Sequence, residues 1–379
     1  MKKIVVVSNT AWSIYNFRLN LMDVLSRKGY QVLALAPEDE FAKKIPFEYH
    51  HISINNKGTN PIEDIILFFK FLYFYKKQKP SLILNYTIKP NVYSTFASQI
   101  LKIPCINNIT GLGSTFTKTT GISTVTRLLY RISAPFASQI FFQNKDDYSL
   151  FQALKIVSKK RVDVIPGSGV DTNKYKPVKR DNEEKFIFLL FARLLWEKGV
   201  GEYIEAAKNI QQRYNNLEFQ ILGFLDVANP SAITKNEIDD WVNRGVIKYL
   251  GSTCDVRYFI ARADCIVLPS YYREGIPKSL LEAASMEKPI ITTNNIGCKE
   301  VVDDGINGFL CNIKDPNDLT EKIERMVNLP EEERINMGKK GRRKILRKFD
   351  EKIVIEKYLD SIKKILEPIN KGFDYDVDK

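Results

Sequence analysis

The sequence predicts an α/β protein of two doubly wound domains, in each of which helices cover both faces of a parallel β-sheet. Short apolar runs alternate along the chain with longer helical stretches, which is the order of repeated strand–helix–strand units. Most of these runs are apolar throughout instead of at every second residue, as expected for strands that are buried on both faces. The length of 379 residues fits two domains better than one.

Thirteen short apolar runs are the expected strands, and they form two series. The first series comprises residues 4–8, 31–36, 49–54, 82–86, 106–110, 140–143 and 162–166. The second series comprises residues 186–192, 218–222, 247–250, 265–269, 290–293 and 308–310. Since helical stretches separate the runs, each series indicates one open sheet of parallel strands.

A polar stretch at residues 175–185 separates the two series, as a linker would. It contains Pro177 and has no apolar period. The predicted domains are therefore residues 1–175 and 176–365, and the last helix of the second one can cross back to the first. Residues 366–379 form a polar tail that we expect to be frayed.

The cysteine and histidine content argues against a structural metal and against disulfides. The five cysteines are an odd number without a Cys-x-x-Cys pair, and the only histidines are the neighbouring His50 and His51. We therefore expect neither a zinc site built from these residues nor a disulfide framework, and a reducing cytoplasm fits best. No run of about 18 apolar residues occurs and no signal peptide is visible, so we expect neither a spanning helix nor secretion.

Charge is unevenly distributed along the chain. Residues 1–180 contain 26 Lys and Arg against 11 Asp and Glu, whereas the remainder contains 31 against 34. The first half is therefore expected to face something anionic, such as a diphosphate, anionic lipid or nucleic acid. Residues 65–79 are aromatic, nearly apolar all round, and end in Lys76, Lys77 and Lys79. This helix either lies in a membrane interface or is a core helix with a solvated end.

Neither predicted domain carries a glycine-rich phosphate loop. The turn after the first strand, residues 8–18, has no glycine, and no G-x-x-x-x-G-K-[ST] sequence occurs in the chain. A nicotinamide or flavin dehydrogenase and a P-loop NTPase are therefore disfavoured.

The segment 264–291 is the most informative for chemistry and is expected to form a strand, a loop, a helix and a further strand. Pro277 suits the first helical position, where its missing N–H has no intrahelical partner. A helix start favours a diphosphate, and Gly275 allows the backbone to approach it closely. Glu274 in the loop and Glu282 in the helix would flank that site and accept hydrogen bonds from sugar and ribose hydroxyls.

Four segments resemble the sequence signatures of glycosyltransferase family 4. Glu274-Gly-Ile-Pro with Glu282 resembles the Glu-x7-Glu signature, and residues 191–199 resemble the Gly-Arg-Leu…Lys-Gly segment, with Ala192 in place of the glycine. Residues 165–171 and 303–309 are similar to the family's Pro-Asn-Gly-Val-Asp and Asp/Glu-Gly-x-x-Gly-Phe/Leu turns. The resemblance covers nearly the whole chain. It implies the GT-B fold, in which two Rossmann-like domains face a central cleft.

The resemblance also implies roles in a retaining sugar transfer without a bound metal. Arg193 and Lys198 would hold the donor diphosphate and stabilise the leaving group, an electrostatic role. Glu274 would hold the hydroxyls of the donor sugar, so these three residues are the expected catalytic group. The implied donor-binding residues are Glu282, which would hold the ribose, and Gly275, Ile276, Pro277, Leu281 and Gly169.

The first half resembles the acceptor domain of bacterial enzymes that extend lipid-linked sugars in O-antigen, capsule or glycoprotein-glycan assembly. The resemblance lies in residues 16–18, 85–91, 108–113 and 143–146, although the histidine frequent in the family near Thr110 is absent. The implied reaction moves a hexose or N-acetylhexosamine from a nucleotide sugar, expected to be UDP-linked, to a polyprenyl-diphosphate-linked saccharide at the inner face of the cell membrane. The implied acceptor-binding residues are Asn16, Arg18, Thr87, Lys89, Thr110 and Gly111.

The sequence alone leaves other functions open. A nucleotide-sugar epimerase or a phosphorylase would share the GT-B fold, but no cofactor-binding lysine setting of a phosphorylase is visible. The basic first half allows a non-enzymatic protein that binds nucleic acid or membrane. No helix-turn-helix, RNP or zinc-finger pattern occurs, so we expect no nucleic acid partner. An inactive scaffold is disfavoured because both glutamates and both basic residues are present.

Overall fold

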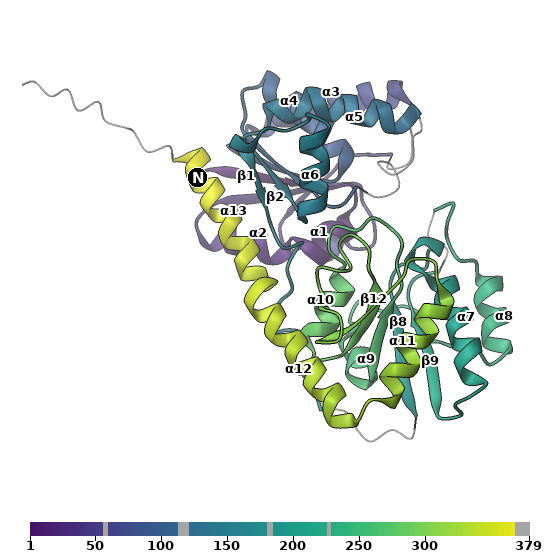
Figure 1. The fold of residues 1–379 in the computed structure, drawn as a ribbon. Coiled ribbons are helices and arrows are strands. Elements are labelled where there is room, and N and C mark those ends of the chain that lie inside the picture. The colour runs from purple at the N-terminus through teal and green to yellow at the C-terminus, as the bar shows by residue number, and fades with distance from the viewer. Residues whose placement is uncertain (56–59, 113–120, 180–184, 226–228, 368–379) are drawn as a thin grey trace, which may run out of the picture.

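The computed structural model describes residues 1–55, 60–112, 121–179, 185–225 and 229–367 and has two α/β domains (Figure 1). The first sheet contains β1 (Lys3–Val7), β2 (Gln31–Ala36), β3 (Glu48–His51), β4 (Leu82–Tyr86), β5 (Cys105–Ile109), β6 (Gln139–Phe142) and β7 (Val162–Val164). The second contains β8 (Phe186–Phe191), β9 (Leu217–Leu222), β10 (Lys248–Tyr249), β11 (Cys265–Leu268), β12 (Ile290–Thr293) and β13 (Gly308–Cys311). Each predicted strand overlaps one of these strands, which confirms the predicted fold class. Residues 368–379 of the predicted tail and Gly113 lie outside the described residues.

Helices cover both faces of each sheet. The first six are α1 (Ala11–Phe17), α2 (Leu19–Arg27), α3 (Pro61–Gln78), α4 (Thr95–Ile100), α5 (Gly121–Ser133) and α6 (Lys145–Ala153). The others are α7 (Val200–Gln211), α8 (Lys235–Asn243), α9 (Arg257–Arg262), α10 (Lys278–Ser285), α11 (Pro316–Asn328), α12 (Glu331–Lys348) and α13 (Glu351–Leu366). The local sequence determines where several of these helices begin. Asn60 caps α3 ahead of Pro61, and Thr234 forms a capping box with Glu237 at α8.

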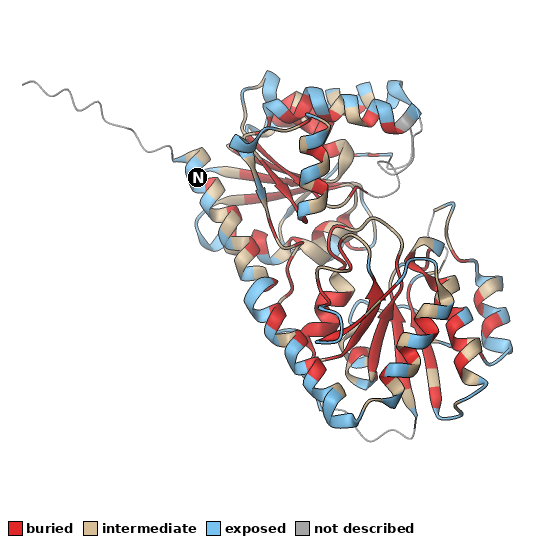
Figure 2. Cartoon of the chain, viewed as in Figure 1, coloured by how far each residue is buried: buried red, intermediate tan, exposed pale blue. Residues whose placement is uncertain are grey.

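Both sheets have the doubly wound strand order. The first runs β3-β2-β1-β4-β5-β6-β7 and the second β10-β9-β8-β11-β12-β13, so the order reverses between β1 and β4 and between β8 and β11. Helices on both faces exclude water from the central strands, which are buried along most of their length (Figure 2). Since ligands of such sheets bind beyond the carboxyl ends of the strands at the reversal point, the loops after β8 and β11 form the expected edge.

Two segments connect the domains, and they run side by side. Ile165 packs in the core of the first domain and Val170 in that of the second, so the chain crosses between them, before the predicted boundary at residue 175. It crosses back between α12 and α13. There the Val170 amide donates to the Phe349 carbonyl (3.0 Å), and the Glu351 amide donates to the Val170 carbonyl (3.0 Å). The polar stretch chosen as the linker follows the first crossing and leads into β8.

Helix α13 packs on the first domain, although it follows the second domain in the chain. Val354, Tyr358 and Ile362 of α13 are buried in one cluster with residues of β1, β4 and α2. The Asn108 side-chain amide donates a hydrogen bond to the Tyr358 hydroxyl (2.7 Å). In Figure 1, the yellow-green and yellow helices α12 and α13 run from the second domain up along the first. The last described helix therefore packs on the domain in which the chain begins.

Candidate active site

Two residues predicted to act on the donor come together at the carboxyl edge of the second sheet. Lys198 ends a short 3₁₀ turn, η6 (Trp196–Lys198), in the loop after β8, and Glu274 lies in the loop after β11. Lys198 Nζ forms an ion pair with Glu274 Oε1, and both side chains are largely buried. Because burial excludes water, charges at this position act more strongly on a ligand than they would at an open surface.

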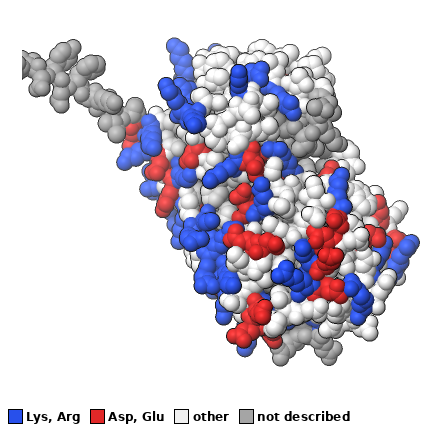
Figure 3. Space-filling view, in the orientation of Figure 1, with Lys and Arg blue, Asp and Glu red and all other residues white. Residues whose placement is uncertain are grey.

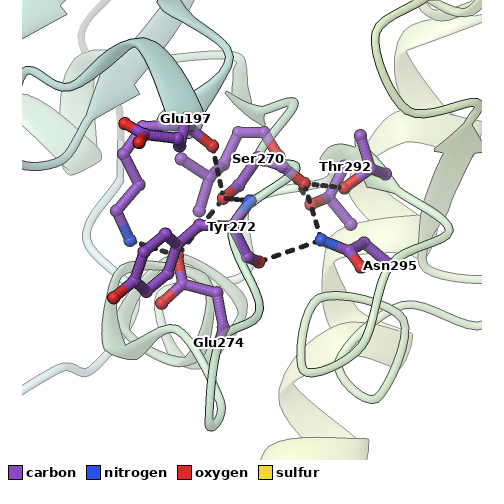
Figure 4. A network of polar contacts seen from close by, with 9 residues as sticks. Glu197, Ser270, Tyr272, Glu274, Thr292 and Asn295 are labelled. Carbon is purple, nitrogen blue, oxygen red and sulfur yellow. Dashed lines mark hydrogen bonds and ion pairs between the residues drawn. The ribbon is translucent and has the colours of Figure 1, made fainter. Parts of the chain in front are cut away.

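Ser270 also contacts the carboxylate of Glu274 (Figure 4). Its Oγ lies 3.2 Å from Glu274 Oε1, the same oxygen that Lys198 binds. Among the described residues, Glu274 Oε2 has no hydrogen-bond partner. One carboxylate oxygen is therefore fixed by the protein, and the other is available to accept a hydrogen bond from a sugar hydroxyl.

A network of backbone contacts holds the loop that carries Glu274. The carbonyl oxygen of Glu197 accepts hydrogen bonds from the amides of Tyr271 and Tyr272 (both 3.0 Å). From the loop after β12, Asn295 Nδ2 donates to the carbonyl of Tyr272 (2.9 Å), as Figure 4 shows. The loops after β8, β11 and β12 are thus fastened to one another around the carboxylate.

Arg193, the second predicted cation, is exposed beside this buried pair. Lys198 Nζ lies 5.5 Å from the centre of the Tyr272 ring. Burial raises the pKa of Tyr272, the negative charge of Glu274 adds to the rise, and the positive charge of Arg193 opposes it. An exposed cation, Arg193, and a buried one, Lys198, therefore both act electrostatically on Tyr272.

Glu282 lies on α10 among a different group of charges. Burial raises the pKa of its carboxyl, while the positive charge of Lys278 and a hydrogen bond with Tyr175 oppose that rise. Lys278 Nζ in turn donates to the carbonyl oxygen of Asn16 in the first domain. Among the described residues, no hydrogen bond or ion pair joins Glu282 to Glu274. The two predicted carboxylates therefore occupy separate places, one at the loop after β11 and one along α10.

Three other predicted donor residues are placed by packing. Ile276 and Leu281 are buried in the apolar core of the second domain. Pro277 precedes α10 with a ψ of 119°, so the prediction that it starts the helix is wrong by one residue. Its extended ψ places it just before the first turn, at the N-cap position of the helix.

Gly169, also predicted to bind the donor, lies at the crossing between the domains. A Cβ added there would stand 2.5 Å from Glu351 Cα, and φ of this glycine is 71°. The absence of a side chain therefore allows the two connecting segments to run in contact.

Gly275 and Gly111 lie where the backbones of the two domains approach each other closely. A Cβ on Gly275 would overlap Gln143 Oε1 and lie 2.8 Å from the carbonyl oxygen of Thr110. A Cβ on Gly111 would lie 2.5 Å from the Gly275 amide nitrogen, and φ of Gly111 is 108°. At Gly275 the backbone therefore closely approaches the first domain, whereas the sequence predicts a close approach to a diphosphate. Thr110 and Gly111, predicted as acceptor residues, directly face the loop that carries Glu274.

Arg18 and Asn16, two further predicted acceptor residues, lie at the start of the first domain. Arg18 is only 4% exposed, and its guanidinium carbon lies 3.9 Å from the centre of the Tyr86 ring. Its Nε has no hydrogen-bond partner among the described residues. Asn16 reaches the second domain through its backbone carbonyl, which accepts from Lys278. The structure therefore brings Asn16 to the donor domain and keeps Arg18 inside the first domain.

Lys89 and Thr87, the remaining predicted acceptor residues, lie just after β4. Lys89 Nζ is 2.6 Å from Asp64 Oδ1 of α3, and Asp64 also accepts a hydrogen bond from the Tyr93 hydroxyl (2.7 Å). Thr87 has a φ of 72°, which is uncommon for a β-branched residue. The charge of Lys89 is thus partly neutralised by Asp64 within the first domain.

Several residues at the contact between the domains had no predicted role. Asn144 Nδ2 donates to the carbonyl of Gly275 (3.2 Å), and Arg273 Nε donates to Asp147 Oδ1 (2.7 Å). Asn144 falls within the segment 143–146 that resembles acceptor domains, and this is its only sequence signal. The Arg273 and Asp147 pair spans 126 residues of sequence, and no local spacing connects them.

Family models match both halves of the chain. The model described as "Glycosyl transferase 4-like" matches residues 3–144, and the model described as "Glycosyl transferases group 1" matches residues 171–344. Together they span most of the two domains described above.

Bacterial transferases are similar in sequence. The N,N'-diacetylbacillosaminyl-diphospho-undecaprenol alpha-1,3-N-acetylgalactosaminyltransferase of Campylobacter jejuni is 28% identical, with 96% of this chain and 99% of that protein covered. The UDP-Gal:alpha-D-GlcNAc-diphosphoundecaprenol alpha-1,3-galactosyltransferase of Escherichia coli is also 28% identical, over 80% of this chain and 78% of that protein.

Solved structures share the fold. A glycosyltransferase from Rickettsia africae aligns with a TM-score of 0.77 at 17% identity, over 97% of this chain and 99% of that chain. The Anabaena protein HepE in complex with UDP aligns with a TM-score of 0.75 at 18% identity, over 96% of this chain and 100% of that chain. With both domains matched by family models, this chain belongs to the GT-B glycosyltransferases, combining a glycosyl transferase 4-like first domain with a second domain of the glycosyl transferases group 1.

Proposed function

We propose that this glycosyltransferase moves a hexose or N-acetylhexosamine from a UDP-sugar to a saccharide linked to polyprenyl diphosphate, with retention of the anomeric configuration. The observation that carries the proposal is the buried pair of Lys198 and Glu274, which lies beside the contact with Thr110 and Gly111 of the first domain. The names of the relatives support it, because the Campylobacter and Escherichia proteins are named for diphospho-undecaprenol substrates and the Anabaena neighbour holds UDP.

In the proposed reaction, the bond between the anomeric carbon and the diphosphate oxygen breaks, and the acceptor hydroxyl oxygen bonds to that carbon on the same face. The proton of the hydroxyl passes to the departing diphosphate, which leaves as UDP. Lys198 and Arg193 stabilise the charge of the diphosphate, and Glu274 orients the sugar through its hydroxyls. Since side-chain cations supply the positive charge, we propose that no metal or other cofactor is needed.

A donor screen tests this function. The protein is mixed with UDP-, GDP- and ADP-sugars, its thermal unfolding is followed, and release of nucleoside diphosphate is measured with and without a lipid-diphosphate sugar acceptor. We expect UDP-sugars to raise the unfolding temperature and release to require the acceptor. Release of a free or epimerised sugar without acceptor would indicate a hydrolase or an epimerase instead. Failure of every nucleotide sugar to bind would refute the proposal.

Replacing Glu282 by glutamine is expected to raise the KM for the donor about 10- to 100-fold. The carboxylate is proposed to hold the ribose, and a hydrogen bond to a charged group contributes about 1.5–3 kcal/mol. Initial rates at varied donor concentration measure the KM. Glu287→Gln, just beyond the end of α10, is the matched control and should leave the KM unchanged. An unaltered donor KM in Glu282→Gln would remove Glu282 from the donor site.

We further propose that the first domain contacts an anionic membrane through one apolar face. This face is formed by exposed residues at helical spacing, namely Ile62, Ile65, Ile66, Phe69 and Tyr73 of α3 and Val125, Leu128 and Ile132 of α5. The opposite side of α3 packs in the core through Leu67, Phe71 and Tyr75. Figure 3 shows Lys and Arg among uncharged side chains over α3 and α4, as binding to anionic headgroups requires.

Among the described residues, no helix has both the length and the apolar character needed to cross a membrane. In the proposed contact, the first domain binds to the membrane surface, and the enzyme would reach its polyprenyl-linked acceptor there.

The double substitution Phe69→Ser and Tyr73→Ser is expected to weaken binding to anionic liposomes about 10- to 100-fold. These side chains are 58% and 71% exposed, and burial of a large apolar side chain contributes about 1.5–3 kcal/mol. Cosedimentation with phosphatidylglycerol vesicles measures the binding. Tyr258→Ser, at a 61% exposed tyrosine of the second domain, is the control and should bind as the unmodified protein does. Equal binding by all three proteins would exclude this face.

A further inference from the structure

The start of α6 in the first domain is built to contact the loop that carries Glu274. Asn144 caps the helix, because its Oδ1 accepts from the amide of Asp147 (2.7 Å). Capping uses only the oxygen of this side chain. The Nδ2 group lies 3.1 Å from Asp147 Oδ2 in the same helix, and 3.3 Å and 3.2 Å from the carbonyl oxygens of Glu274 and Gly275 in the other domain. One buried side chain therefore caps the start of a helix and also contacts the backbone of Glu274 and Gly275.

An ion pair reinforces the same contact on the other side of Glu274. Arg273 Nε donates to Asp147 Oδ1 (2.7 Å), and the Asp147 side chain is fully buried whereas that of Arg273 is 16% exposed. Lys299 and Asp146 form a second ion pair between the domains (3.1 Å), but these side chains are 38% and 39% exposed. Both pairs join α6 to the second domain, the buried one to the loop after β11 and the solvent-exposed one to the loop after β12.

The side chain and the backbone of Glu274 are held by different domains. Lys198 and Ser270 of the second domain engage the carboxylate, while Asn144 of the first domain engages the carbonyl groups of residues 274 and 275. If the domains separate, these contacts to the backbone are lost and Asp147 loses its cation. A buried charge pair contributes little net stability compared with apolar packing. We therefore assign to the Arg273 and Asp147 pair a role in fixing the geometry of the contact between the domains.

We propose that Asn144, Asp147 and Arg273 are positioning residues that place Glu274 only while the two domains are closed, so that the donor-sugar site is completed by the first domain. This inference rests on the proposed role of Glu274 in holding the donor sugar. It makes sugar transfer depend on closure, whereas binding of the nucleotide part, at Glu282 and the second domain, does not require these three residues.

The decisive variant is Asn144→Asp, assayed in the full-length protein. Aspartate retains the capping oxygen, but it has no N–H to donate and places a carboxylate against two carbonyl groups and the carboxylate of Asp147. We expect kcat to fall about 10- to 100-fold, since a displacement of about 1 Å at a reacting group has an effect of that size. The Kd for the nucleoside diphosphate of the active donor, measured by calorimetry, should remain within about twofold of that of the unmodified protein. A general loss of structure would instead impair both kcat and this Kd.

A double-mutant cycle on the ion pair tests the same inference independently. Asp147→Asn and Arg273→Gln should each lower kcat, and the double variant should be no worse than the more affected single one, because both remove the same contact. Lys299→Ala breaks the exposed pair and is the matched control, with kcat expected to be unchanged. If Asn144→Asp does not fold, this cycle decides.

Normal kcat in Asn144→Asp, or additive losses in the cycle, would overturn the inference while leaving the proposed function intact. An unmodified enzyme that transfers no sugar from any nucleotide donor would instead overturn the proposed function, and the variants would then show no difference. The two failures are therefore distinguishable in one set of assays.

Discussion

Glu274→Gln is expected to lower kcat about 10²–10³-fold while the protein remains folded. Glutamine has nearly the same shape, but it carries no charge and presents an NH₂ group where the carboxylate accepts hydrogen bonds. Lys198, which is buried against Glu274, would lose its counter-charge, and the sugar would lose a fixed acceptor. Removal of one preorganised electrostatic group from an active site has an effect of this size.

Rates at saturating donor and acceptor measure this effect, with release of nucleoside diphosphate as the signal. Ser270→Ala removes one hydroxyl donor to the same carboxylate oxygen and provides a graded comparison. Its loss should be about 10- to 100-fold, because a hydrogen bond to a charged group contributes about 1.5–3 kcal/mol. A Glu274→Gln enzyme with a kcat within a few-fold of normal would show that the carboxylate does not act on the reacting sugar.

Gly275→Ala is expected to reduce kcat/KM by about 10²-fold through the contact between the domains. The new methyl group would overlap Gln143 Oε1 and stand 2.8 Å from the carbonyl oxygen of Thr110. The glutamine side chain can move, but the backbone of Thr110 cannot without disturbing β5, so the domains would have to separate. A shift of about 1 Å at the reacting groups is enough for such a loss.

Gly121→Ala is the matched control for this substitution. A Cβ at Gly121 meets nothing within 4 Å, and the residue has no positive φ, so its activity should be unchanged. The double variant Gly275→Ala with Gln143→Ala removes the first overlap but not the second, and should recover activity only in part. Full activity in Gly275→Ala would mean that closure is less tight during transfer than in this structure.

The two sheets, and the position of Glu274 in a loop after a strand, could be predicted because their sequence signals are local. A strand of a covered parallel sheet is apolar along its length, which is why the predicted strands coincide with β1–β13. The spacing of Glu274 and Glu282 lies within one loop and one helix. Because β8 and β11 are neighbours in the second sheet, the loops that follow them bring Lys198 close to Glu274.

The remaining features depend on contacts between residues far apart in the chain. Nothing in the sequence around Arg18 shows that Tyr86 covers its guanidinium group, and nothing near Asp147 shows that Arg273 will meet it. The sequence predicts that Gly275 approaches a phosphate, whereas its neighbours in the structure are Gln143 and Thr110. For residues 65–79 the sequence left two alternatives, because a helix apolar on all sides does not reveal which side the core will cover.

Helix α13 has a consequence for how the protein is made. Tyr358 lies against Phe141, with ring centres 4.8 Å apart, and also beside Tyr86. During translation the ribosome produces these first-domain rings early and Tyr358 only after the entire second domain. The apolar flank of the first domain that α13 covers therefore stays uncovered until residues 351–366 have been synthesised. Because transiently exposed apolar surface favours aggregation, this flank is the part of the growing chain that must be protected longest.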